Sequence, residues 1–320
     1  MNMGCGCSIR IIALVAILLL ALFLTGFVFG PIGSSFLDTK APAFLAVTKP
    51  HIEIPPEGIL HTPVLTITNT LIASWLTIIV LIGLFYAFTR KMKLIPGRLQ
   101  GLAEVIVEII LNFIKSAAGE KNARIFFPMV ATIFLYVLTN AFLALLPFFG
   151  TIGIYEHSGA FVPILRGANT DINLPLSIAL IAVISVEYWG VRSLGSFRYL
   201  NSFFNFGQLR DGFVSLFKGK IRPAISGILF GIINLYVGVL EVLSHLIRII
   251  SFTLRLFGNM TAGEILLVVV CFLTLFSIPI FIYGLELLMG LIQALIFAGL
   301  TLVFGIIALT PHDEGSEHKT

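Results

Sequence analysis

The chain has 320 residues, of which 58% are hydrophobic and only 11% are charged, and its mean hydropathy is +1.04. Soluble globular proteins are typically about 45–50% apolar and about 25% charged, so this composition excludes a large soluble catalytic domain and predicts one membrane domain. The net charge of +4 follows from basic loops beside a membrane and predicts no nucleic-acid partner. Cys5, Cys7 and Cys271 lack the spacing of a metal site or a disulfide framework, so we expect no metal and no cofactor.

A membrane helix needs about 20 mostly apolar residues, and several segments satisfy that length. The chain is therefore predicted to be an all-α integral membrane protein with about five or six membrane helices. The last two candidate spans are far longer than one perpendicular crossing requires, so we expect them to be strongly tilted, broken or partly parallel to the bilayer. In chain order the candidate spans are Ile9–Phe29, Thr70–Phe88, Phe126–Phe149, Leu174–Val191, Ile225–Val270 and Phe272–Leu309.

The first apolar segment has two interpretations. Residues 1–30 carry one basic residue, Arg10, before a leucine-rich run, which is the outline of a signal peptide. The apolar region of a signal peptide is usually about 7–15 residues long, and this one is longer, which favours a retained N-terminal anchor over a cleaved signal. Residues 31–69 then form an external segment under either interpretation.

Leu94–Ala118 differs from the other apolar segments. Glu104, Glu108 and Lys115 lie near one helical face while Leu, Ile, Val and Phe fill another. This pattern predicts an amphipathic helix at the membrane surface or against a partner.

Basic residues indicate the orientation, because cytoplasmic loops of membrane proteins are enriched in Lys and Arg. Two loops are basic, Arg90–Arg124 and Arg192–Arg222, whereas Gly30–Asn69 and Gly150–Asn173 are poor in positive charge, the latter holding only Arg166. We therefore place the N-terminus and the basic loops inside. Residues 70–311 form the predicted membrane domain, and 312–320 form a polar cytoplasmic tail.

Ionisable groups within the last two spans are the candidate functional residues. Each charge near the centre of a membrane helix costs about 2.5–3.5 kcal/mol, so these side chains must contact water, each other or a partner. On a regular helix Glu241, His245, Arg248, Arg255 and Asn259 fall within roughly 80° of one another and form a polar stripe, while Glu264 lies about 140° from Glu241 unless Gly258 or Gly263 bends the helix. The final span adds Glu286 and Gln293 on one face.

Several ordered motifs resemble those of the a subunit of F-type ATP synthases. The run Ser251-Phe-Thr-Leu-Arg255-Leu-Phe-Gly-Asn259-Met-Thr-Ala-Gly-Glu264 looks like that family's signature, with its essential arginine at Arg255. Glu241 and Gln293-Ala-Leu-Ile-Phe297 also fall where the family has a glutamate and a Q-A-x-I-F run. Ile67-Thr-Asn-Thr70 and Asn169-Thr-Asp-Ile-Asn173 look like its other recurrent stretches. The family often has a Glu/His pair at the positions of Glu264 and Glu286; both are glutamates here.

The resemblance implies a proton-translocating, non-catalytic subunit. Its expected partners are a ring of c subunits, the b subunit stalk, other ATP synthase subunits and membrane lipid, and its expected location is a bacterial plasma membrane. Glu264, Glu286 and Gln293 would line a half-channel open to the outside, and Glu241 with Ser244 or His245 would line one open to the inside. Arg255, with Asn259 nearby, would separate the two. The coupling ion, proton or sodium, stays open.

Three alternatives compete with this interpretation. The ionisable residues are satisfied buried polar groups that hold helices together, the chain is a secondary transporter or channel, or it is a structural assembly subunit. A transporter often carries inverted repeats, and none is visible in the sequence. A structural subunit does not require five ionisable groups on one membrane helix.

Overall fold

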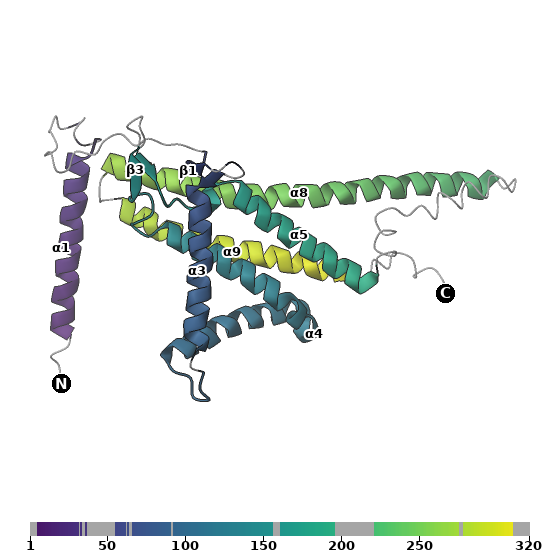
Figure 1. The fold of residues 1–320 in the computed structure, drawn as a ribbon, viewed down its shortest axis with the longest axis horizontal. Coiled ribbons are helices and arrows are strands. Elements are labelled where there is room, and N and C mark those ends of the chain that lie inside the picture. Colours follow the sequence, from purple (N-terminus) through teal and green to yellow (C-terminus); the bar gives the residue numbers. More distant parts are fainter. Residues whose placement is uncertain are drawn as a thin grey trace. The chain divides into compact units, whose positions relative to one another are not determined.

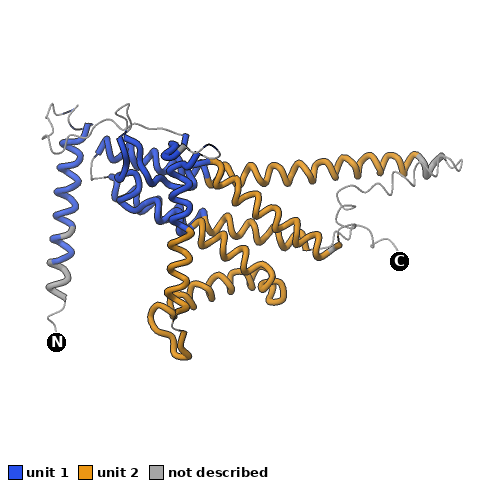
Figure 2. The backbone as a smooth tube through the Cα atoms, in the orientation of Figure 1, with its two compact units in different colours: residues 1–77, 138–171, 257–293 blue, residues 78–137, 172–256, 294–320 orange. Residues whose placement is uncertain are grey.

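The computed structural model describes residues 5–31, 33, 36, 55–61, 63, 66–90, 92–155, 161–195, 221–274 and 278–309. The predicted tail at 312–320 and most of the second basic loop lie outside these residues. The chain divides into two compact units, each made of segments distant in sequence (Figure 2). Unit 1 comprises Met1–Thr77, Leu138–Asp171 and Phe257–Gln293, and unit 2 comprises Ile78–Val137, Ile172–Leu256 and Ala294–Thr320.

Six helices among the described residues are long and apolar enough to cross a membrane, which confirms the prediction of an all-α integral membrane protein. They are α1 (Cys5–Phe29), α3 (Asn69–Thr89), α4 (Arg98–Ala144), α5 (Asn173–Leu194), α8 (Ile221–Thr274) and α9 (Pro279–Leu309) (Figure 1). The predicted boundary between the last two spans was wrong, because α8 continues through Thr274 and α9 begins at Pro279. No helix-breaking residue lies between Val270 and Phe272, so α8 continues past them. Pro279 instead marks the start of α9, because proline is favoured in the first turn of a helix.

The length of α8 fits no single upright crossing. Its 54 residues span about 80 Å at about 1.5 Å per residue, against a hydrocarbon core of about 30 Å. Within unit 2, α8 runs across the direction of α3 instead of along it (Figure 2). Two helices with such directions cannot both stand upright in one bilayer, which supports the predicted tilt of α8.

A kink divides α4 close to the predicted end of the amphipathic helix. Gly119 has a φ of 76° and a ψ of 162° inside the helix, so the segment from Arg98 to Ala118 and the segment after Gly119 take different directions. The first segment buries Ile110 and Ile114 and leaves Leu99 and Leu102 exposed. A helix therefore exists where the amphipathic one was predicted, and it begins at Arg98 instead of Leu94.

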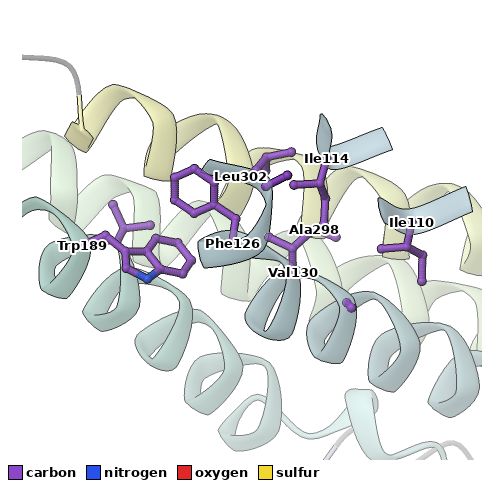
Figure 3. Packing of buried hydrophobic residues seen from close by; sticks show 10 residues of the cluster. Ile110, Ile114, Phe126, Val130, Trp189, Ala298 and Leu302 are labelled. Atoms are coloured by element: carbon purple, nitrogen blue, oxygen red, sulfur yellow. The ribbon is translucent and has the colours of Figure 1, made fainter. Parts of the chain in front are cut away.

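The core of unit 2 joins α4, α5 and α9. Phe126 packs edge-to-face on Trp189 with ring centroids 4.7 Å apart, and Val130, Ala298 and Leu302 fill the space beside them (Figure 3). A Cβ added at Gly305 would lie 2.8 Å from the Phe126 ring and 3.0 Å from the Trp189 ring. Close packing around this aromatic pair fixes the helical part of unit 2.

Two short antiparallel hairpins in unit 1 were not predicted. β1 (Gly58–His61) pairs with β2 (Thr66–Thr68), and β3 (Gly153–Tyr155) pairs with β4 (Phe161–Pro163). Asn69, the first residue of α3, donates from Nδ2 to the carbonyl oxygen of Pro163 at 3.3 Å. This bond ties the start of α3 to the hairpin that precedes α5.

We expect Gly119→Ala to destabilise the protein. The backbone conformation of Gly119 is nearly restricted to glycine, and a side chain there costs about 1–3 kcal/mol. Gly101→Ala is the matched control, because Gly101 lies within the helical part of α4 and an added Cβ there meets nothing within 4 Å. That control should be neutral or stabilising by up to about 1 kcal/mol. Thermal unfolding in detergent compares the two, and a Gly119→Ala protein as stable as Gly101→Ala would exclude the kink as a fixed feature.

Candidate functional site

Unit 1 contains a cluster of buried polar side chains where the two hairpins meet the helices. Thr70 donates from Oγ1 to Oδ2 of Asp171 at 3.1 Å. Asn140 on α4 donates from Nδ2 to Oδ1 of Asn169 at 3.0 Å. We call this the polar cluster, and its members are Asn69, Thr70, Asn140, Asn169, Thr170 and Asp171, all of them buried. The structure thus brings together the two polar stretches around Thr70 and Asn169 that the sequence singled out.

An ion pair connects the segment before the polar cluster to α8. Nε of Arg166 donates to Oε1 and Oε2 of Glu264 at 3.0 and 3.2 Å, and Nη1 donates to the carbonyl oxygen of Pro55 at 3.3 Å. The Arg166 side chain is only 7% exposed, so its charge depends on the carboxylate of Glu264. Sequence reasoning treated Arg166 only as a lone charge in an outward loop and missed this role. Arg166 lies directly before the polar run Asn169–Asn173, and this position is the sequence signal that could have indicated its role.

A cavity of about 120 Å³ in unit 1 places Glu264 and Glu286 together. Arg166 and Thr170 also line it, and its volume has room for several water molecules. The carboxyl group of Glu286 lies against Gly263, where an added Cβ would overlap it. The predicted association of the two glutamates therefore agrees with the geometry, although Arg166 was not foreseen as a neighbour.

Gln293 lies on α9 about two turns from Glu286 and is not among the residues that line the cavity. Its side chain is 4% exposed, and within the described ranges Nε2 has no hydrogen-bond partner. The same holds for Nδ2 of Asn169 and Oγ1 of Thr261, both in unit 1. Buried polar atoms usually have partners, so these atoms indicate positions for bound water. Asn259, also singled out by the sequence, is half-buried on α8.

The remaining predicted residues lie on the unit 2 part of α8 and have different surroundings. Nδ1 of His245 is 2.6 Å from Oε1 of Glu187 on α5. The guanidinium carbon of Arg248 lies 3.5 Å from the centre of the Phe304 ring on α9. Glu241 is half-buried, and no residue that the structure describes forms an ion pair with it. The predicted polar stripe is therefore divided, since His245 and Arg248 face other helices.

Arg255 is exposed on the surface of α8. Among the described residues none forms an ion pair or a hydrogen bond with its side chain. A guanidinium stays protonated, and an obligate cation on a helix of membrane-spanning length requires an anion or water.

The fold and these sites define a multi-pass membrane protein whose long helices carry ionisable side chains, some of them paired and some, such as Arg255, exposed. The ATP synthase A chain family matches residues 71–305. The chain belongs to this family and is therefore a subunit of an ATP synthase.

Individual relatives agree with the family. ATP synthase subunit a of Gloeobacter violaceus is 30% identical over 246 residues, covering 77% of this chain and 85% of the relative. ATP synthase subunit a 3 of Pelobacter propionicus is 31% identical, covering 72% of this chain and 83% of the relative. ATP synthase subunit a of Moorella thermoacetica is 26% identical, covering 78% of this chain and 94% of the relative.

We expect Gly263→Ala to slow proton transport without preventing assembly. The added Cβ would overlap the carboxyl group of Glu286, and a flexible side chain moves more readily than the backbone. The sequence predicts that Glu286 lines a half-channel, and misplacement of a reacting group by about 1 Å can cost about 100-fold in rate, so a reduction of about tenfold or more is expected. The measurement is ATP-driven acidification of membrane vesicles, normalised to the amount of assembled complex.

Gly284→Ala is the control for this substitution, because an added Cβ at Gly284 on α9 meets nothing within 4 Å. It should transport protons at the parental rate. Equal rates for Gly263→Ala and Gly284→Ala would show that the position of Glu286 against α8 does not matter.

Proposed function

We propose that this chain is the proton-translocating a subunit of an F-type ATP synthase and that it provides two half-channels separated by Arg255. The observation that carries this proposal is the exposed Arg255 side chain, which has no anionic partner among the described residues. Because lipid cannot supply that anion at low cost, it comes from another chain. In the proposed complex it is the carboxylate of a c subunit in the rotating ring.

The surface around Arg255 supports close approach of such a ring. Ser251, Gly258 and Ala262 follow the arginine's face of α8 at helical spacing, and all three are exposed. Small residues let neighbouring membrane helices approach closely. Leu254, beside the arginine, is 52% exposed and adds an apolar contact surface. A ring carboxylate could therefore reach the guanidinium without displacing bulky side chains.

The outer half-channel is assigned to unit 1. Glu264 and Glu286 line one cavity with room for several water molecules, and Gln293 continues the polar face of α9 beyond Glu286. The buried polar atoms of Asn169, Thr261 and Gln293 that have no described partner favour a chain of bound water. In this scheme Arg166 holds the Glu264 carboxylate in place, and water carries protons between the carboxyl groups.

The inner half-channel is assigned to the unit 2 part of α8, where Glu241 and His245 are both half-buried. Ser244 lies between them and is exposed. A proton released by the ring near Arg255 would pass along these side chains to the cytoplasm. Asn259, one turn beyond Arg255, would help to position the Arg255 side chain for its contact with the ring.

Separation of the two paths turns ion flow into rotation. The membrane potential supplies about 2.3 kcal/mol per elementary charge per 100 mV, and this energy drives the ring only if protons cannot cross without it. A fixed guanidinium attracts the deprotonated ring carboxylate and repels free protons, so Arg255 acts as an electrostatic barrier and not as a catalyst. The chain itself is proposed to catalyse no reaction.

The remaining assignments follow from the same proposal. The b subunit stalk and other ATP synthase subunits would hold this chain still while the ring turns. The membrane is proposed to be a bacterial plasma membrane, since the curated relatives are bacterial. Residues 70–311 would form the membrane domain and 31–69 an external segment, after an N-terminal signal-like segment or anchor.

We expect Arg255→Lys to abolish coupled proton pumping although it keeps the positive charge. Lysine lacks the planar fork of the guanidinium and can lose its proton when desolvated. Arg248→Lys is the matched control on the same helix, because lysine can also lie over the Phe304 ring. The test compares ATP-driven acidification of inverted vesicles for both variants. Parental pumping by Arg255→Lys would contradict the proposed barrier.

The assignment of outer and inner paths depends on orientation, which cysteine labelling can test. Thr151 and Ser116 are both exposed, and we expect them to face opposite sides of the membrane. After replacement of Cys5, Cys7 and Cys271, Thr151→Cys should react with an impermeant thiol reagent in intact cells, and Ser116→Cys only in inverted vesicles. The reverse pattern would exchange the two half-channels, and labelling of both from one side would contradict the span assignment.

A further inference from the structure

An acidic side chain on α5 faces the inner half of α8, and the assignments above leave it without a role. Nδ1 of His245 lies 2.6 Å from Oε1 of Glu187. Both atoms are inaccessible to solvent, while the two side chains are 20% and 29% exposed. The contact has the length of an ion pair without the angles of a hydrogen bond. Two proton-binding atoms thus meet at a distance that a single proton transfer can cross.

The helices that carry or pack near this pair differ in their ionisable side chains. From Ala294 onward α9 carries no ionisable side chain. On α5, Arg192 lies five residues after Glu187 and donates a hydrogen bond from Nη1 to the hydroxyl of Tyr188 at 3.1 Å. On α8, Arg248 lies over the Phe304 ring. A carboxylate and an imidazole within helices of membrane-spanning length cost free energy. Two uncharged side chains at the positions of Glu187 and His245 would join α5 to α8 at a lower cost.

We propose that Glu187 is a proton-transfer residue of the inner path and works as a pair with His245. The inference rests on the proposed function of the chain. A proton on Nδ1 of the imidazolium passes to Oε1 of the Glu187 carboxylate, which leaves a neutral imidazole and a carboxylic acid. Oε1 is buried but the Glu187 side chain as a whole is 29% exposed, so the acid can release a proton to water from its exposed part, and the pair returns to a neutral imidazole beside a carboxylate. No electrons move, and one proton crosses the pair in each cycle.

The position of Glu187 along α5 suits such a step. It lies about 10 Å from the end of the helix at Leu194, measured along the axis. That end leads into the second basic loop, which the orientation places in the cytoplasm. On α8, His245 lies one turn closer to Arg255 than Glu241 does, so its imidazole can receive a proton that the ring releases near Arg255. Glu187 therefore extends the inner path from α8 to α5.

The test is passive proton conduction through the membrane sector, measured in vesicles after removal of the catalytic subunits and normalised to assembled complex. Glu187→Gln keeps the size of the side chain and removes its proton-binding carboxylate. We expect it to reduce conduction by about tenfold or more. Glu187→Asp should restore much of the loss. A double variant, Glu187→Leu with His245→Leu, preserves contact between the helices and should conduct as poorly as Glu187→Gln.

The double variant distinguishes proton transfer from a structural role. Parental conduction by an assembled double-leucine variant, or by Glu187→Gln, would overturn the inference. If Glu187→Gln does not assemble, His245→Gln is measured instead, because it removes the other proton-binding group of the pair. Reduced conduction by His245→Gln would support the pair, and parental conduction would overturn it. Parental conduction by Glu187→Gln alongside loss of coupling in Arg255→Lys would overturn only the role of Glu187, whereas parental conduction by a variant that lacks His245 would also overturn the assignment of His245 to the inner path. A parental complex that conducts no protons would overturn the proposed function itself.

Discussion

A guanidinium group keeps its proton at any pH a cell encounters, so an arginine at membrane depth must be matched by an anion or by water. Two of the described arginines, Arg166 and Arg255, show opposite arrangements. Arg166 is buried and bonded to Glu264 within unit 1. Arg255 is exposed, and the described part of the chain offers it no anion. The first arrangement stabilises the fold, and in the proposed function the second is completed by a carboxylate of another subunit.

The geometry of unit 1 follows from the need to satisfy polar groups away from water. The bonds between Thr70 and Asp171 and between Asn140 and Asn169 connect α3, α4 and the segment before α5. Each bond alone contributes only about 0.5–1.5 kcal/mol, but leaving a buried partner unsatisfied costs about 1–3 kcal/mol. Together these bonds hold the wall of the cavity in which Glu264 and Glu286 meet. A fixed wall with a water-filled interior is what a proton path requires.

Much of the fold could be predicted from the sequence, because apolar length and basic loops are strong signals in a membrane protein. The spans were found in this way, whereas the association of Glu264 with Glu286 was expected only from the resemblance to the family. The hairpins were missed because their strands are only three or four residues long. The kink at Gly119 depends on one backbone conformation that no periodicity reveals. Arg166 and Glu187 were missed because their partners lie on helices far away in the sequence, and only tertiary structure brings them together.

The central claim is that the anion for Arg255 belongs to a neighbouring ring subunit. Disulfide cross-linking tests it most directly, with Leu254→Cys beside Arg255 and a cysteine next to the carboxylate of the ring subunit, after replacement of Cys5, Cys7 and Cys271. Ile181→Cys, exposed on α5, is the control. We predict a product of one a subunit joined to one ring subunit for Leu254→Cys and none for Ile181→Cys. No product from Leu254→Cys, or equal product from both positions, would contradict the claim.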